Sequence, residues 1–99
     1  MKTIFIVYNQ AITEEILEVL EEHAIRGFTK WTDVQGRGSK TGDPHMGTHT
    51  WPPMNGAMLS VVPDDKVSGI FESLRKTNAA AKDQGLKAFS WPVEEFLDE

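Results

Sequence analysis

Residues 57–74, AMLSVVPDDKVSGIFESL, decide the fold of this chain. Five of the first six residues are apolar and two are β-branched, which predicts a strand over Ala57–Val62. Pro63 and the two aspartates that follow it predict the start of a helix. The apolar residues of that helix recur at helical spacing and form one face: Val67, Ile70, Phe71 and Leu74. A strand that leads directly into an amphipathic helix is half of a β-α-β unit.

The N-terminal third of the chain has the same order. Thr3–Tyr8 is continuously apolar, which predicts a strand buried on both faces. Thr13 is predicted to cap a helix that has two glutamates in its first turn, and Gly27 is predicted to stop it. Phe28–Val34 predicts a second strand, in which the uneven apolar spacing indicates a bulge or a twist.

The C-terminal part supplies the last predicted strand, Leu86–Trp91, which Pro92 ends. The acidic tail Val93–Glu99 is expected to form one helical turn. The sequence thus predicts one domain over residues 1–99 with an α+β, ferredoxin-like βαββαβ order. This fold is a four-stranded antiparallel sheet with two helices on one face. Its other face would be open, so we expect copies of the chain to cover it as a homotrimer.

Between the two halves lies a long segment of different composition, residues 36–56. Five of the eight glycines and three of the five prolines of the chain fall here. Such a segment cannot form the core, and loops of this length in a compact domain are usually functional or disordered. We therefore expect a functional loop between the second and third strands.

Composition excludes several classes of function. The formal net charge of -5 leaves no basic stripe to neutralise phosphates, so nucleic acid is not an expected partner. The absence of cysteine removes disulfides, thiol nucleophiles and thiolate metal sites. The apolar run at the N-terminus is too short for a signal peptide or a membrane span, so we expect a cytoplasmic protein without direct membrane insertion.

Three stretches of the chain resemble a known family. Ile25-Arg26-Gly27-Phe28-Thr29 runs into the start of the predicted second strand, residues 33–42 (DVQGRGSKTG) lead from that strand into the loop, and Val61–Val67 joins the third strand to the second helix. In order and spacing these stretches resemble the P-II signal transduction family, the trimeric nitrogen-regulator proteins and their P-II-like relatives. The resemblance covers most of the chain.

The resemblance implies clefts between subunits that hold ATP or ADP, and a T-loop, here about residues 36–56, that docks onto a target protein. By position it implies that three residues wall the adenosine and that the glycines and polar residues at the start of the loop lie beside the phosphates. The implied nucleotide-binding residues are Gly27, Phe28, Thr29, Gly36, Gly38, Ser39, Lys40 and Gly85. Gly85 is the one match to the family's B-loop, and the family's C-terminal arginines are replaced by an acidic tail.

The loop also contains residues 45–54, HMGTHTWPPM. Imidazole nitrogen and thioether sulfur together suit soft or borderline ions such as Cu, Ag and Zn. The candidate metal ligands are His45, Met46, His49 and Met54. Glycine and prolines make a helix improbable here, so the helical spacing of the two histidines does not support a preformed site. The alternative is a partner-docking loop anchored by Trp51, Pro52 and Pro53, since tryptophan and methionine are typical of interfaces.

Three functions remain open at this level. The first is a P-II-like regulator that senses a small effector, an adenine nucleotide or a metal ion, and signals through its T-loop to a protein target, which we expect to be a membrane transporter. The second is a metal-binding protein or buffer of the CutA type that uses the His/Met loop. The third is a small enzyme or dimeric α+β-barrel protein, which we disfavour because no acid–base pair is visible. We therefore expect a regulator rather than an enzyme.

Overall fold

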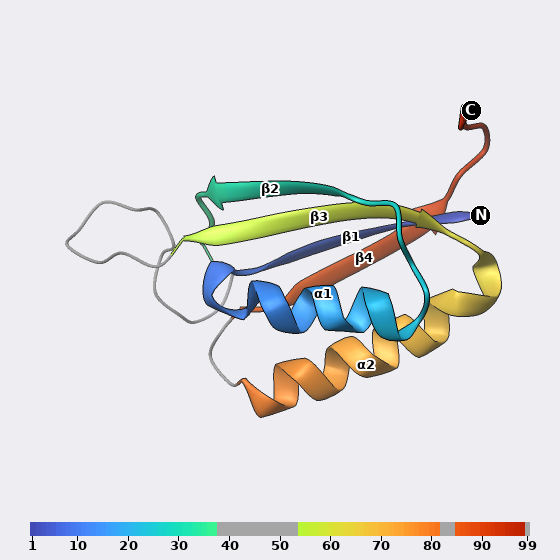
Figure 1. The fold of residues 1–99 in the computed structure, drawn as a ribbon. Helices are drawn as coiled ribbons and strands as arrows, with labels where there is room; N and C mark the ends of the chain where they lie inside the picture. The colour runs from blue at the N-terminus through green and yellow to red at the C-terminus, as the bar shows by residue number, and fades with distance from the viewer. Residues whose placement is uncertain (38–53, 82–84, 99) are drawn as a thin grey trace.

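The computed structural model describes residues 1–37, 54–81 and 85–98. Within them the elements follow the predicted order (Figure 1). They are β1 (Lys2–Asn9), α1 (Thr13–Glu22), β2 (Thr29–Val34), β3 (Asn55–Val62), α2 (Val67–Ala80) and β4 (Lys87–Pro92). Short 3₁₀ turns, Gln10–Ile12 and Asp64–Lys66, precede the two helices. The predicted α+β ferredoxin-like fold is confirmed.

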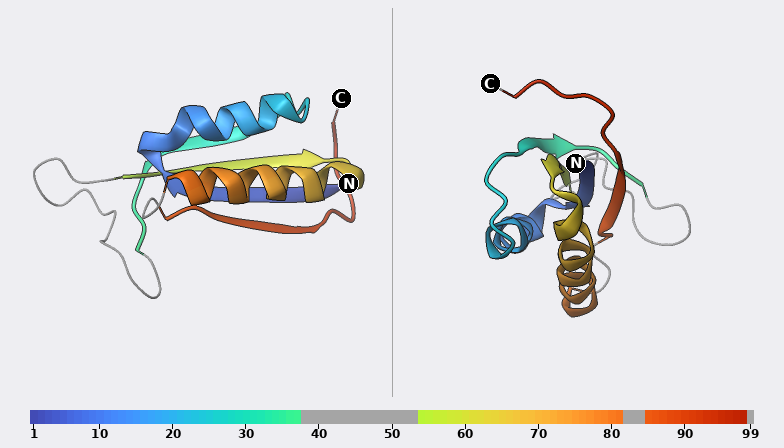
Figure 2. Two further views of the ribbon diagram at one scale, coloured as in Figure 1. Left: turned by 90° about the horizontal axis from the view of Figure 1, so that it is seen from below. Right: turned by 90° about the vertical axis from the view of Figure 1, so that its right-hand side faces the viewer.

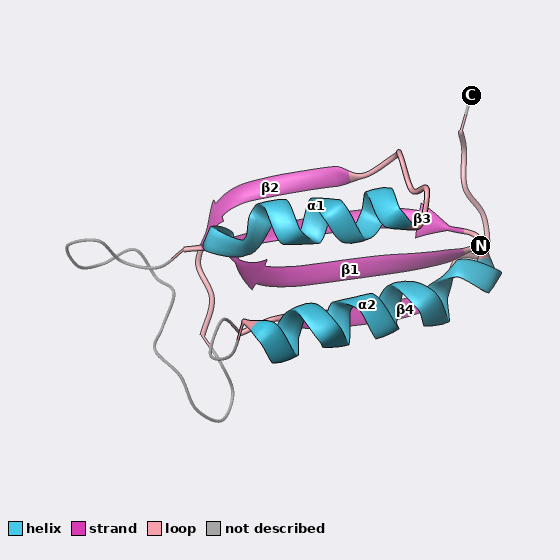
Figure 3. Ribbon diagram, turned by 60° about the horizontal axis from the view of Figure 1, so that its bottom comes forward, coloured by secondary structure: helices cyan, strands magenta, loops and turns pink. Residues whose placement is uncertain are grey.

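The four strands form one antiparallel sheet in the order β2-β3-β1-β4. β1 is central and pairs with both β3 and β4, so β2 and β4 are the two edges. Figure 3 shows α1 and α2 in front of the same face of this sheet, and Figure 2 shows the same layering from two other sides. The opposite face, which we call the open face, has no described element packed on it.

The core lies between the sheet and the helices. β1 contributes Ile4, Ile6 and Tyr8, which are almost fully buried against residues of both helices and of β3. Phe5 and Val7 point to the open face and are only half-buried. The prediction that this strand is buried on both faces is therefore wrong for the single chain, because helices cover one face only.

The start of α1 differs from the predicted capping. The side chain of Asn9 accepts a hydrogen bond of 2.9 Å from the backbone nitrogen of Ala11 and so caps the 3₁₀ turn that leads into the helix. Thr13, the predicted cap, instead donates its hydroxyl to the carbonyl of Gln10 at 2.6 Å. Asn9 is the cap in place of Thr13 because the chain already forms a 3₁₀ turn over Gln10–Ile12.

The end of α1 also differs from the prediction, since the helix stops at Glu22 and not at Gly27. Ala24 has a left-handed backbone with φ of 58°. Its nitrogen donates to the carbonyl of Glu21, and the nitrogen of Ile25 donates to that of Leu20. These two bonds form a Schellman motif, which usually has glycine at the left-handed position.

Replacing this alanine with glycine should stabilise the protein. The left-handed backbone conformation costs an L-residue roughly 1–2 kcal/mol of conformational free energy, whereas glycine adopts it without that cost. We expect Ala24→Gly to raise the free energy of unfolding by about 1 kcal/mol in urea titrations. Ala79→Gly, at an exposed position inside α2, is the matched control and should lower it by up to about 1 kcal/mol. A loss of stability in Ala24→Gly would contradict the motif.

The remaining boundary predictions have mixed outcomes. The pairing of β2 with β3 shifts register between Trp31 and Val34, so the predicted bulge is confirmed. β3, α2 and β4 begin and end close to their predicted positions. The predicted helical turn in the tail is wrong, because residues 93–98 follow an irregular path away from the sheet.

Candidate functional site

The open face carries a run of aromatic side chains across three strands. The ring of Phe5, on central β1, lies 6.4 Å from that of Trp31 on β2, in an edge-to-face arrangement, and 6.5 Å from that of Trp91 on β4. Register places Leu59 and Phe89 beside Phe5 on the same face. Trp31, Phe89 and Trp91 are each close to half exposed. A contiguous apolar face of this kind marks an interaction surface.

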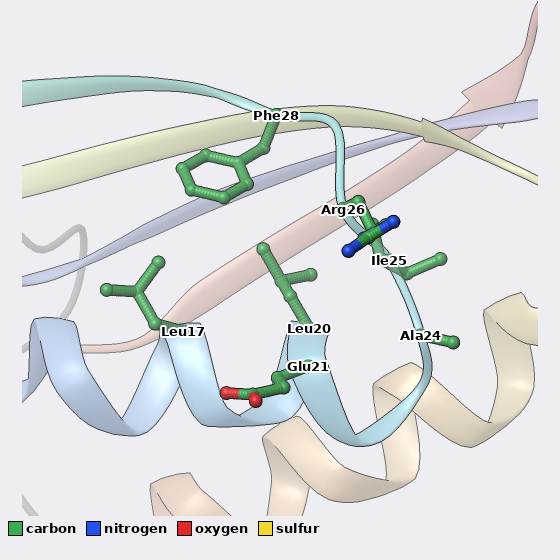
Figure 4. Close-up of a pocket in the computed structure, with 7 residues that line it drawn as sticks. All are labelled: Leu17, Leu20, Glu21, Ala24, Ile25, Arg26 and Phe28. Carbon is green, nitrogen blue, oxygen red and sulfur yellow. The ribbon is translucent and has the colours of Figure 1, made fainter.

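The start of β2 holds three of the predicted nucleotide-binding residues. The ring of Phe28 points toward α1, where Leu17 and Leu20 face it across a pocket (Figure 4). Thr29 pairs with Leu59 and so lies on the open side of the sheet. The carbonyl of Gly27 accepts a hydrogen bond from the hydroxyl of buried Ser60 on β3. Phe28 and Thr29 thus face opposite sides of β2.

Two other predicted nucleotide-binding residues lie at the far end of the sheet. Gly36 follows β2, whereas Gly85 precedes β4 and has a left-handed φ of 71°. β2 separates Gly36 from Gly27 by on the order of 20 Å, given the rise per residue in a strand. Gly36 and Gly85 are themselves at opposite edges of the sheet. A single chain therefore does not bring the predicted nucleotide-binding residues together.

The described residues that flank the predicted T-loop are closely packed at Gly36. A Cβ atom at Gly36 would overlap the side-chain amide nitrogen of Asn55, the first residue of β3, which is itself buried. A side chain at position 36 would therefore require the Asn55 amide to move. This contact gives a structural reason for glycine at position 36, the first glycine of the predicted phosphate-binding stretch.

Gln10, just before α1, forms hydrogen bonds to a residue on each side of segment 38–53: to Asp33 in β2 and to Met54 just before β3. Its side chain makes two hydrogen bonds with Asp33, one to the carboxylate at 2.9 Å and one from the backbone nitrogen at 2.6 Å. Its own backbone nitrogen donates to the carbonyl of Met54 at 2.8 Å. Asp33 is at the β2 bulge and has a left-handed φ of 56°. We call this set of contacts the Gln10 clamp.

Sequence reasoning missed the Gln10 clamp. Gln10 lies between a strand and a helix, and no sequence motif around it predicts a side-chain contact with a distant residue. The only sequence signal near it was the uneven spacing in Phe28–Val34, which indicated a bulge but not its partner.

Tyr8 lies under the loop base, on the helix side of β1. Its ring packs on Gly56, where an added Cβ would lie 2.7 Å from the phenol oxygen. That oxygen is buried and has no hydrogen-bond partner among the described residues. Burial raises the pKa of Tyr8, and the neighbouring Thr13 side chain lowers it by a smaller amount.

The raised pKa makes stability depend on alkaline pH. Below about pH 10 the folded and unfolded states both keep the phenol proton, so no stability is lost. Above it the unfolded state releases the proton while the folded state retains it, so stability should fall as pH rises toward the folded pKa. Tyr8 is the only tyrosine of the chain, so tyrosinate absorbance reports this group alone. We expect its midpoint above 10 in the folded protein; a midpoint at or below 10 would contradict its burial.

Tyr8→Phe is the matched variant for this titration. It removes a buried hydroxyl that has no partner among the described residues, and a phenylalanine fills nearly the same space. We expect its free energy of unfolding at pH 7 to rise by about 1 kcal/mol, and the alkaline loss to disappear. Urea titrations at neutral and at strongly alkaline pH measure both effects.

The remaining predicted site residues lie in or beside the loop. Gly38, Ser39, Lys40, His45, Met46, His49, Trp51, Pro52 and Pro53 fall outside the described residues. Met54 is described, half-buried and held by its carbonyl in the Gln10 clamp. Residues 1–37, 54–81 and 85–98 contain no group of three or more metal-ligating His or acidic side chains. The predicted metal site therefore depends on the segment 38–53 and stays a prediction.

Comparison with known proteins places the chain in a family. Residues 1–97 match the family model described as nitrogen regulatory protein P-II. Comparison with curated proteins gives no significant match. Among solved structures, CPII of Thiomonas intermedia K12, a nitrogen regulatory PII-like protein, superposes with a TM-score of 0.76 at 18% identity. That alignment covers 91% of this chain and 82% of CPII.

A second relative has the same fold. A putative PII-like signaling protein of Thermus thermophilus superposes with a TM-score of 0.68 at 17% identity, over 91% of this chain and 83% of that one. The fold and the site define a class of ferredoxin-like domain with two helices on one face of its sheet and exposed aromatic side chains on the other. The chain belongs to the P-II family. No helix within its described residues has the length and apolarity to cross a membrane.

Proposed function

We propose that the chain is a P-II-like regulator that assembles into a homotrimer through the open face. The observation that carries this is the aromatic run of Trp31, Phe5 and Trp91, in which both tryptophans are 44% exposed in the single chain. Burying such a surface is favourable by about 25 cal/mol for each Å² removed from water. Closed rings are common among homo-oligomers, and three copies is the number that the family resemblance implies.

Assembly would also bring together predicted nucleotide-binding residues that lie far apart in a single chain. β2 and β4 are opposite edges of the sheet, so a ring of copies would set the β4 edge of one against the β2 edge of the next. Gly85 before β4 would then approach Gly36 of the neighbouring copy, since both lie at the loop end. We propose that the nucleotide binds between copies, with its phosphates at these glycines and its adenosine toward Gly27 and Thr29.

The proposed effector class is an adenine nucleotide. Structures of CPII are described as bound to ADP and bicarbonate, and also to ADP, AMP and bicarbonate. The described residues include three arginines, Arg26, Arg37 and Arg75, which lie far apart in the chain, so we expect ADP or AMP to bind more tightly than ATP. Bicarbonate is a second candidate effector, and its binding is to be measured with and without nucleotide.

The proposed signal runs from the nucleotide to the T-loop. A ligand at Gly36 would contact the strand that the Gln10 clamp ties to α1 and to the exit of the loop. It can change the loop only if it binds one loop conformation better than another. The loop would then dock onto a protein target, which we propose to be a membrane transporter, with Trp51 and its neighbours as the contact.

Isothermal titration tests the proposed site. ADP, AMP and ATP, each with and without bicarbonate, should give one nucleotide for each chain of the trimer. Gln10→Ala should change how strongly the nucleotide alters protease cleavage of the loop while leaving the trimer intact; Glu72→Ala, on α2 and outside the clamp, is its control. No heat change with any nucleotide would remove the nucleotide proposal and leave the fold and the family.

A further inference from the structure

The C-terminal tail exposes large apolar side chains. Pro92 ends β4, and the nitrogen of Val93 still donates to the carbonyl of Met1 at 3.2 Å. Beyond it Phe96 is 53% exposed and Leu97 is 85% exposed. Figure 1 shows the tail leaving the sheet on the side away from the helices. Covering these two side chains with another surface would be favourable by about 25 cal/mol for each Å² removed from water.

The pocket beside Phe28 is an apolar receptor of suitable size. Its volume is about 450 Å³, and its walls include Leu17, Leu20, Ile25 and Phe28. Figure 4 shows that Phe28 reaches from the segment before β2 toward the leucines of α1. Its rim carries the charged side chains of Arg26 and Glu21.

Charge favours the tail as the occupant. Glu94, Glu95 and Asp98 flank the two apolar residues of the tail, so an acidic and apolar segment would meet an apolar pocket with an arginine on its rim. Glu21 would repel the same carboxylates, so the tail should enter from the side of Arg26. Rim charges of this kind orient a partner more than they hold it.

The tail cannot fill the pocket of its own chain. The pocket adjoins the β2 edge, three strand spacings or about 14 Å from the β4 edge where the tail begins. Five residues from Val93 to Leu97 span at most about 17 Å. Almost all of that length would be used in crossing the sheet, yet the tail leaves on the open side and the pocket is on the helix side.

A neighbouring copy shortens this path, because the tail then has to pass around only one edge, the β2 edge of that copy, to reach its helix side. Register puts the end of β4, where Pro92 pairs with Lys2, and the start of β2 at the same end of the sheet. In a ring that sets β4 of one copy beside β2 of the next, the tail of the first copy therefore begins next to the pocket of the second. We propose that Phe96 and Leu97 of one copy bind in the pocket beside Phe28 of its neighbour.

The proposal rests on the proposed assembly but concerns a different surface. The ring of Phe28 faces the helices and Thr29 faces the open side. A docked tail and a nucleotide would therefore occupy opposite sides of β2. The tail would act as a strap between adjacent copies, and Phe28 would bind it in place of the adenosine contact that the family resemblance implies.

Cysteine crosslinking tests the strap, because the natural chain contains no cysteine. Glu21→Cys on the pocket rim and Asp98→Cys, next to the two proposed anchors in the tail, are made as separate full-length proteins, refolded together and oxidised with diamide. The matched control replaces Glu21→Cys with Glu72→Cys, an exposed glutamate of α2 that does not line the pocket. We expect at least about tenfold more disulfide-linked dimer with Glu21→Cys than with the control.

Each other outcome overturns the strap. Equal crosslinking with the control, in a protein that is still trimeric, rejects it and leaves the proposed assembly and nucleotide site untouched. A disulfide within one chain, formed when both cysteines are on the same copy and absent from the mixture, shows that the tail folds back on its own chain. A monomer in solution rejects the strap together with the assembly.

Discussion

Replacing Trp31 with glutamate is expected to dissociate the assembled protein into folded monomers. Trp31 is 44% exposed in the single chain and packs edge-to-face on Phe5, so its loss costs the monomer little. Between copies it would be a buried aromatic anchor, the kind of residue whose removal costs at least about 2 kcal/mol of binding. A carboxylate forced into that interface adds the cost of burying a charge.

The change should be visible as a shift in mass. We expect the dissociation constant of the assembly to rise by about 30-fold or more, since each 1.4 kcal/mol is a factor of ten. Sedimentation velocity over a dilution series measures it, and circular dichroism checks that the monomer is folded. Ala79→Glu adds the same charge on the helix side and should leave the assembly intact. An unchanged assembly in Trp31→Glu would show that the open face is not the interface.

Gly36→Ala is expected to disrupt the loop base and with it nucleotide binding. The added methyl group would overlap the amide of Asn55, which is buried and engaged in an interaction of its own. Overpacking at a site of this kind costs about 1–3 kcal/mol of stability. Because the strand must move to make room, we expect the affinity for ADP to fall at least about tenfold, as a displacement of the phosphate-binding backbone implies.

Gly27→Ala provides the control for the change in stability. Gly27 is also a predicted nucleotide-binding residue, but a Cβ there meets nothing within 4 Å, so this variant should fold with unchanged stability. A second check is the double variant Gly36→Ala with Asn55→Ala, which removes the amide that the methyl group would strike. We expect the double variant to lose less stability than the sum of the two single losses, as neighbouring sites are not additive. Full ADP affinity in Gly36→Ala would contradict the placement of the phosphates.

Periodicity was sufficient for most of the fold. Apolar runs place β1 and β3 within two residues of their observed bounds, and helical spacing identifies the apolar face of α2, because burial against a single layer of helices imposes these patterns directly. The bulge in β2 was also predicted from the sequence, because the register shift interrupts the alternation of apolar and polar residues in Phe28–Val34. Burial of the second face of β1 was not predictable from one chain, because that face depends on whatever packs against it.

The site was harder to predict because it depends on contacts between distant segments. No local pattern shows that Gln10 binds both Asp33 and Met54. Alanine gives no signal of a left-handed residue, so the end of α1 at Ala24 was missed in favour of Gly27. The family resemblance named Gly27 and Gly36 as parts of one site, but it could not show that β2 holds them at opposite ends of the sheet.

Native mass spectrometry in the presence of ADP tests the central claim most directly. The claim is that copies of the chain unite through the aromatic face and bind the nucleotide between them. It predicts a species of three 11.1 kDa chains that carries up to three ADP molecules, with no ADP on any monomer. A single chain that binds ADP by itself, or a chain that stays monomeric at every concentration, would contradict it.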